Sequence, residues 1–221
     1  DSVERLHKPS PNYYGIDYWN AYEFSYLNAS SQQKLETLEI KIPADSKITV
    51  ESKSLKIYLA SFYKKKFKAS INAHQLIAKD LSKLLQSKIM VSKKNFYEEA
   101  PKAFLLNRSD AMVPKNKIIR YEGFRSICPV TSQPDWANIY IHSSSNALDA
   151  KKIIKLLKSF KERGDFHEAC IDSIFTSLMH DFHINDLTVC GRFLRRGGID
   201  INPIRSSKKK IFFNNFRDFN Q

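Results

Sequence analysis

The first half of the chain changes from a strand-like to a helix-like spacing of apolar residues. Across residues 35–42, every second position from Leu38 onward is apolar, which is typical of a half-buried strand. Residues 43–45 (Pro-Ala-Asp) indicate a turn after it. Apolar residues then recur at helical spacing, which predicts a helix that begins with Ser52 as its N-cap. A second amphipathic helix is predicted over residues 70–86.

The second half repeats this order of strand and helices. Residues 137–142 alternate between polar and apolar and predict a strand. Asp149 is the predicted cap of an amphipathic helix that ends at Gly164. A further helix follows at once, and residues 187–193 predict a closing strand.

Strand-like segments precede a pair of helices in each half, and this order predicts an α+β fold with antiparallel sheets. We divide the chain into an N-terminal half, residues 1–105, and a C-terminal half, residues 106–221. The stretch 93–120 shows no clear periodicity and is expected to link the halves, and the tail 207–221 is expected to be loose. The six glycines form no Gly-x-Gly-x-x-Gly motif, so any dinucleotide must bind otherwise than in a Rossmann site.

The composition indicates a cytoplasmic protein, and its basic charge has two explanations. No apolar run approaches the ~20 residues that span a bilayer, and the first residues lack a signal-peptide pattern. Three cysteines without disulfide-like spacing favour a reducing compartment. The net charge of +13, with a basic and aromatic run at 63–68, favours a polyanionic or phosphorylated partner. A lysine-rich solvated surface explains the same charge equally well.

The segment 128–136 holds a candidate nucleophile. Within it, Pro129 and Pro134 bracket a short irregular stretch, so Cys128 and Asp135 are both predicted to lie on turns. A carboxylate near a thiol can accept its proton and later return it to a reacting atom. The alternative is a small buried cysteine and an ordinary turn aspartate.

The segment 165–170 has two interpretations. Asp165 and Glu168 have the spacing of a capping box at the start of a helix. Alternatively, His167 and Glu168 face a pocket, where a carboxylate suits the paired N–H donors of a purine-like ring.

Two basic segments are candidate phosphate sites. Lys53 and Lys56 fall in the first turns of a predicted helix, where the macrodipole already favours anions. Arg195 and Arg196 precede a pair of glycines and suit bidentate phosphate contact. Solvated charges are the alternative at both places.

Zinc is a further alternative. Cys170 lies three residues after His167, and His180 and His183 are also three apart, so helical faces offer nitrogen and sulfur ligands. The sequence contains no compact four-ligand spacing, and we expect no metal.

In combination and in this order, these segments resemble the nitrile reductases of queuosine biosynthesis (the QueF family), in their long form with two halves. The resemblance runs from about Tyr14 to Ser206. It lapses between Lys93 and Arg120, where this chain is shorter than the family leads us to expect. It rests on residues 51–58, 128–136, 166–168 and 195–203, with 14–17 and 22–28 resembling the opening of the long form.

The resemblance implies a fold and a reaction. It implies two tandem tunnelling-fold (T-fold) halves that associate at least as a homodimer. The Cys128 thiol would add to the nitrile carbon of 7-cyano-7-deazaguanine (preQ0) to give a covalent thioimide, with Asp135 as general acid and base. Two hydrides from two NADPH molecules would then give the aminomethyl product (preQ1) by way of an imine.

The resemblance also implies binding roles. Glu168 would hold the edge of the deazaguanine, assisted by His167 in positioning or proton transfer. Phe166, Glu51 and Ser52 would border the same pocket. The candidates for binding NADPH are Lys53, Ser54, Lys56, Arg195, Arg196 and Gly197.

Two rival functions remain. One is a zinc-dependent enzyme of the same T-fold that processes pterins or purines, favoured by the six histidines. The other is a non-catalytic RNA-binding module, favoured by the basic charge. The resemblance favours a small-molecule substrate, without membrane or direct nucleic-acid binding.

Overall fold

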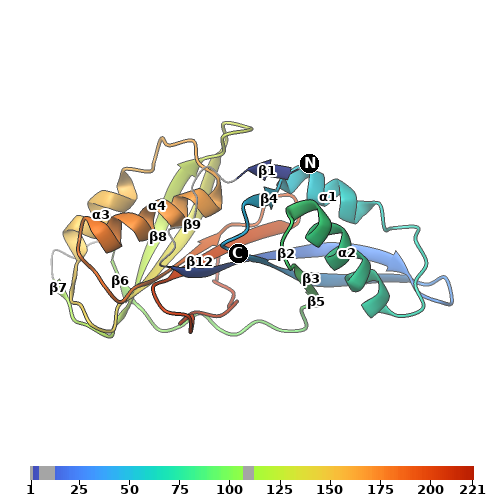
Figure 1. The fold of residues 1–221 in the computed structure, drawn as a ribbon, viewed down its shortest axis with the longest axis horizontal. Coiled ribbons are helices and arrows are strands. Elements are labelled where there is room, and N and C mark those ends of the chain that lie inside the picture. The colour runs from blue at the N-terminus through green and yellow to red at the C-terminus, as the bar shows by residue number, and fades with distance from the viewer. Residues whose placement is uncertain (1, 5–12, 107–111) are drawn as a thin grey trace.

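A computed structural model describes residues 2–4, 13–106 and 112–221 (Figure 1). The elements of the first half are β1 (Ser2–Glu4), β2 (Tyr14–Leu27), β3 (Gln33–Pro43), β4 (Ile48–Val50), α1 (Ser52–Ala60), α2 (Ser70–Leu85) and β5 (Met90–Lys93). Strand β6 (Phe104–Leu105) ends the first half. The elements of the second half are β7 (Met112–Val113), β8 (Ile118–Ile127), β9 (Pro134–His142), β10 (Leu148–Asp149), α3 (Ala150–Lys158), α4 (His167–His180), β11 (Thr188–Phe193) and β12 (Ile199–Ser206).

One continuous sheet runs through both halves. Its eight strands have the order β5-β3-β2-β12-β11-β9-β8-β6. Neighbouring strands are antiparallel except for the short parallel pair of β6 and β8. The halves join where β12, the last strand of the chain, pairs with β2. The chain therefore has the expected mixed α+β architecture with a mainly antiparallel sheet.

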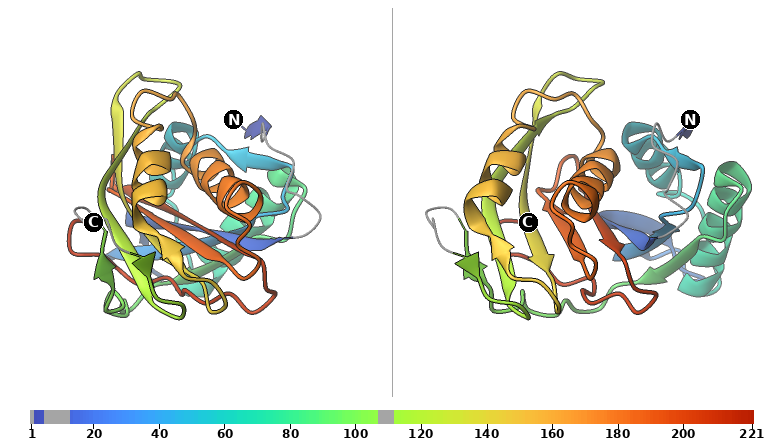
Figure 2. Two further views of the ribbon diagram at one scale, coloured as in Figure 1. Left: turned by 90° about the vertical axis from the view of Figure 1, so that its left-hand side faces the viewer. Right: turned by 60° about the vertical axis from the view of Figure 1, so that its left-hand side comes forward.

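Both helix pairs of the described residues cover the same face of this sheet (Figure 1). Figure 2 shows that the sheet is curved and that the helices lie on its concave side. Leu55 of α1 and Ile77 of α2 belong to one buried cluster with Ile40 of β3. Ile199 of β12 completes this cluster, so a C-terminal strand contributes to the N-terminal core. A second cluster joins α3 and α4 to β8, β9 and β11. None of these helices is long and apolar enough to cross a membrane, within the part of the chain that the structure describes.

The C-terminal tail covers the opposite face of the sheet, which corrects the prediction that it is loose. Phe213 and Phe216 pack on Tyr140, Cys190 and Ile204 to form a third buried cluster. Its sequence lacks periodicity because the tail is irregular: it packs through single aromatic residues and polar contacts.

Polar contacts also fix the tail behind the second half of the sheet. The buried Asp218 carboxylate accepts hydrogen bonds from Asn138 Nδ2 and the Tyr140 hydroxyl, each at 2.8 Å. Gln221 Nε2 donates to the backbone oxygen of Phe193 at 3.0 Å. These bonds reach strands β9 and β11 directly behind the residues that face the helices.

The predicted helices are present, with two corrections at their ends. Glu51 caps α1 instead of Ser52, because its side chain accepts the backbone N–H groups of Lys53 and Ser54. Asp149 caps α3 as predicted, accepting from Lys152 N at 3.0 Å. That helix ends at Lys158, well before Gly164.

The strands were predicted less completely. Residues 35–42 lie in β3, 137–142 in β9 and 188–193 in β11, as the alternation indicates. The spacing of apolar residues did not predict strands β2, β8 and β12. In β2 and β8 a register shift interrupts the alternation, and β12 is buried along its whole length. The stretch 93–120 contains β6, β7 and the start of β8, besides residues 107–111, which lie outside the described residues.

Candidate active site

A cavity of about 410 Å³ lies where the N-terminal ends of α1 and α4 meet. Both halves line it: Glu51 and Ser52 come from the start of α1, and Phe166, His167 and Glu168 from the start of α4. The β8–β9 loop and the turn between β11 and β12 close its remaining sides. Segments more than a hundred residues apart in the chain therefore share one pocket.

Only one of the three cysteines lines this cavity. Cys128 is half-buried, and its backbone N–H donates to Gln133 O at 2.8 Å, closing the β8–β9 loop. Cys170 and Cys190 are fully buried, and burial raises the pKa of these thiols to about 12 and about 11. Cys128 is thus the one cysteine that lines the cavity, and it is the candidate nucleophile.

Asp135 lies in the same cavity between the side chains of His167 and Arg196. It belongs to strand β9, which begins at Pro134, so the prediction that it sits on a turn is wrong. The first position of a strand tolerates proline, which allows this start. Its carboxylate is 3.3 Å from His167 Nε2 and pairs with Arg196 Nη1.

These neighbours determine the charge of Asp135. Burial raises the pKa of this carboxyl, but the hydrogen bond and charge of His167, and then those of Arg196, outweigh it. The net effect holds the pKa of Asp135 below its ordinary value. Asp135 is therefore a carboxylate at neutral pH, and a carboxylate can accept a proton.

His167 is held in place from two sides. Its ring stacks on Phe193 of β11, with centroids 3.9 Å apart and planes 13° apart. Its Nε2 faces Asp135, which leaves the ring little freedom to turn. Of the two interpretations of segment 165–170, the capping box is wrong, because the N-cap is Phe166 and no side chain caps the helix.

Glu168 is a buried carboxylate at the cavity wall. Its side chain is 4% exposed, and Oε1 accepts a hydrogen bond from Thr49 Oγ1 at 3.1 Å. Thr49 lies in β4 and also lines the cavity. An ionised carboxylate accepts several hydrogen bonds at once, so Glu168 suits a ligand with adjacent N–H donors.

Basic side chains also line the cavity. Lys53, Lys56 and Arg196 are all lining residues, together with Gly197. The first backbone N–H groups of α1 are occupied by the Glu51 carboxylate. An anion here would consequently be held by the side chains, not by the helix N-terminus.

Two of the predicted cofactor residues lie outside the lining. The Arg195 guanidinium carbon stands 4.9 Å from the centre of the Tyr22 ring, and the Ser54 backbone N–H donates to Glu51. Thr49 and Gln133 line the cavity but were not singled out from the sequence. Gln133 accepts a hydrogen bond from Arg196, a pairing across 63 positions that no local motif reveals.

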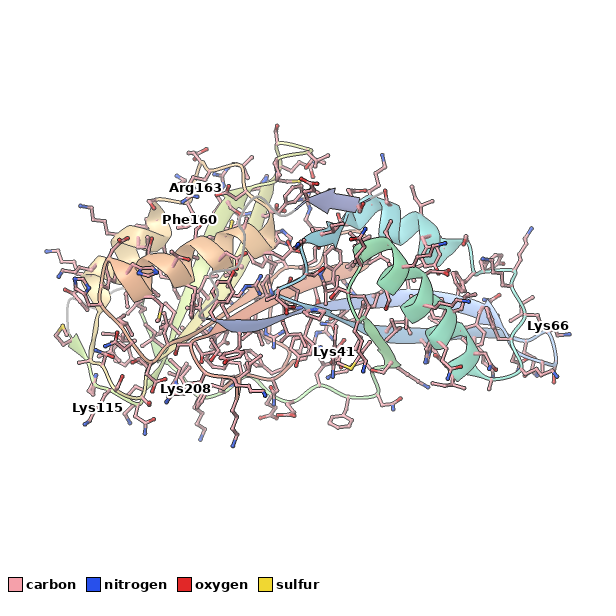
Figure 3. All side chains as sticks on the ribbon, in the orientation of Figure 1. Lys41, Lys66, Lys115, Phe160, Arg163 and Lys208 are labelled. Carbon is pink, nitrogen blue, oxygen red and sulfur yellow. The ribbon has the colours of Figure 1, made fainter. Side chains whose placement is uncertain are left out.

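The residues that favoured the zinc enzyme and the RNA-binding module, which are possible metal ligands and basic side chains, are dispersed over the described part of the chain. Within residues 2–4, 13–106 and 112–221, no three His, Cys, Asp or Glu side chains form a group that could hold a metal ion. Basic residues are spread widely, and Figure 3 shows Lys66 and Lys115 at opposite ends of the molecule.

Comparison with known proteins assigns the family. The model described as "Nitrile reductase, 7-cyano-7-deazaguanine-reductase N-term" matches residues 3–93, and "QueF-like protein" matches 134–212. The NADPH-dependent 7-cyano-7-deazaguanine reductase of Coxiella burnetii is 34% identical, over 96% of this chain and 83% of that protein. The proteins of the same name from Teredinibacter turnerae (36% identical, 87% and 77% covered) and Hahella chejuensis (33%, 89% and 80%) are similar. The chain belongs to the 7-cyano-7-deazaguanine nitrile reductase family.

Proposed function

We propose that this protein reduces the nitrile of 7-cyano-7-deazaguanine (preQ0) to the aminomethyl group of preQ1 with two NADPH, in queuosine biosynthesis. Its relatives carry the name of that activity. The observation that carries the proposal is the convergence of the Cys128 thiol, the Asp135–His167 pair and the Glu168 carboxylate on one cavity. Cys128 lies outside both family-model matches, so its role rests on this geometry.

Cys128 is proposed to form a bond between Sγ and the nitrile carbon. A free thiol is mostly protonated at neutral pH, so its proton must leave as the sulfur attacks. Asp135 accepts that proton and returns it to the nitrile nitrogen, which gives a neutral C=N–H thioimide with no leaving group. Every atom of thiol and nitrile is retained in the adduct.

His167 and Arg196 act on both directions of this proton transfer. Both keep Asp135 ionised, which is the form that accepts the proton, and both make it a weaker base. Because the same contacts make protonated Asp135 a stronger acid, they also favour return of the proton to nitrogen. His167 keeps its orientation through the Phe193 stack.

Glu168 is proposed to hold the heterocycle, with Phe166, Glu51 and Ser52 bordering it. A guanine-type ring presents a ring N–H beside an exocyclic amine, and a carboxylate accepts both. Glu168 is buried at the cavity wall, so this pairing is shielded from water.

The cavity fits the phosphates of NADPH, which supplies a hydride to each of the two reduction steps when bound. Lys53, Lys56 and Arg196 are the side chains that would contact phosphate oxygens. At Gly197, with φ of +59°, a Cβ would lie 3.1 Å from Lys56 Nζ, so glycine keeps this lysine close to the turn. Arg195 and Ser54 remain weaker candidates because they lie outside the lining.

Finer features of the family are proposed with the activity. They are two tandem T-fold halves, assembly as a homodimer or larger homo-oligomer, and a cytoplasmic location. The sequence of strands and helix pairs in each half and the three free cysteines support them.

The direct experiment is NADPH oxidation by the purified protein with 7-cyano-7-deazaguanine as substrate. We expect two NADPH consumed for each aminomethyl product, measured by absorbance and mass spectrometry. The matched control is 7-deazaguanine, which lacks the nitrile and should consume none. Absence of nitrile-dependent oxidation at micromolar to millimolar substrate would contradict the proposal.

A further inference from the structure

We propose that Thr49 is a positioning residue that fixes the Glu168 carboxylate for a ligand with two adjacent N–H donors, and thereby sets selectivity for guanine-type heterocycles. This inference rests on the proposed function and deepens it. Thr49 would not touch the reacting nitrile and would act through Glu168.

The contact connects the two halves of the chain. Thr49 Oγ1 donates to Glu168 Oε1 at 3.1 Å across 119 sequence positions, and both side chains are at most 5% exposed. Thr49 and Glu168 both line the cavity. A hydroxyl from the N-terminal half is therefore hydrogen-bonded to the carboxylate that is proposed to bind the heterocycle.

The position of Thr49 is itself fixed. Strand β4 pairs with β1, so that Thr49 lies opposite Val3, and Val3 also lines the cavity. Threonine is branched at Cβ, which restricts its rotamers and keeps the hydroxyl directed at one oxygen. The donor is thus rigid, and a rigid donor orients the acceptor that it binds.

Orientation matters most for a ligand with two donors. A carboxylate that is held in one plane can accept a ring N–H and an adjacent amine together, in the bidentate manner of planar donor pairs. One that turns freely meets only one donor well at a time. Loss of the hydrogen bond from Thr49 should consequently weaken the binding of a ligand with two N–H donors more than the binding of a ligand with one.

The competing explanation is purely structural: Thr49 would merely satisfy a buried carboxylate. Such a role predicts equal weakening of every ligand that occupies the cavity. The ratio of two dissociation constants therefore separates the explanations.

The test compares Thr49→Val, which removes the hydroxyl at similar volume, with Thr49→Ser, which keeps it. Each is made in a Cys128→Ala background, so that calorimetry reports reversible binding without the covalent adduct. The probes are 7-cyano-7-deazaguanine and 7-cyano-7-deazahypoxanthine, which lacks the exocyclic amine. If Thr49→Val does not fold, Thr49→Ala replaces it with the same expected ratio.

We expect Thr49→Val to raise the Kd of the guanine-type ligand about tenfold, and that of the hypoxanthine-type ligand by no more than about twofold. Thr49→Ser should restore the original ratio. With Cys128 present, kcat at saturating nitrile should stay within about twofold while KM rises, because the reacting groups are untouched.

Equal weakening of both ligands, an unchanged ratio, or failure of Thr49→Ser to restore it would overturn the inference. Its failure is distinct from failure of the proposed function. In the first case the unaltered protein still turns over the nitrile, and in the second it does not.

Discussion

Removal of the Arg196 guanidinium is expected to shift the acid limb of the pH–rate profile for adduct formation to higher pH. Arg196 pairs with Asp135, and together with His167 it lowers the pKa of that carboxyl against the effect of burial. Arg196→Gln removes one of the two neighbours that lower the pKa of Asp135, and so raises that pKa. A protonated Asp135 cannot accept the thiol proton, so the rate will fall at a higher pH than in the unaltered protein.

The magnitude follows from the exposure of the two partners. Asp135 is 4% exposed, whereas the Arg196 side chain is 38% exposed. Two unit charges about 4 Å apart interact by about 4 kcal/mol at an effective dielectric constant of about 20. Solvent screening of the half-exposed guanidinium reduces this substantially. We expect a shift of about one pH unit, equivalent to about 1.4 kcal/mol.

The assay is the rate of adduct formation without NADPH, followed by quenched intact-protein mass spectrometry from about pH 2.5, below the ordinary pKa of an aspartate, to about pH 8. Leaving out NADPH removes any effect of Arg196 on cofactor binding. Lys53→Gln is the matched control, because Lys53 lines the same cavity, whereas His167 and Arg196 are the residues that lower the pKa of Asp135. An unmoved limb in Arg196→Gln, or an equal shift in Lys53→Gln, would refute the reasoning.

Three further outcomes are expected. Lys53→Gln should raise KM for NADPH roughly tenfold to a hundredfold but leave KM for NADH nearly unchanged, since NADH lacks the 2′-phosphate; equal effects in steady-state kinetics would remove the phosphate role. Activity should survive exhaustive chelation, and stoichiometric zinc by elemental analysis with loss of activity on its removal would favour the rival enzyme class. Phe216→Ala should lower the free energy of unfolding by about 3–5 kcal/mol in urea, because Phe216 is buried against Tyr140 with ring centroids 4.9 Å apart; a change below about 1 kcal/mol would show that the tail contributes little.

The local spacing of apolar residues was sufficient to predict the elements that have one polar and one apolar side. Apolar residues recur at helical spacing in α2 and at every second position in β3, so the sequence predicts the ends of both elements to within two residues. Strand β12 alternates only over residues 199–202, and it is buried on both sides because helices cover one of its faces and the tail the other. Its polar residues Asp200 and Asn202 belong to a buried hydrogen-bonded network.

The site was predictable as a set of segments but not as a set of contacts. Cys128, Asp135, His167 and Glu168 were singled out, and all line one cavity. The pairing of Arg196 with Asp135 and of Thr49 with Glu168 depends on which strands become neighbours in the sheet. No spacing within either segment carries that information, so the phosphate-site interpretation of Arg196 missed its bond to Asp135.

Covalent attachment of the nitrile to Cys128 is the step on which the proposed reaction depends. Intact mass spectrometry after mixing the protein with 7-cyano-7-deazaguanine, without NADPH, measures it directly. Since addition to a nitrile expels no leaving group, the protein should gain the full mass of the substrate, and peptide mapping should locate it on Cys128. Cys128→Ala should show neither the adduct nor turnover. An adduct on Cys170 or Cys190, or full turnover by Cys128→Ala, would contradict the proposed mechanism.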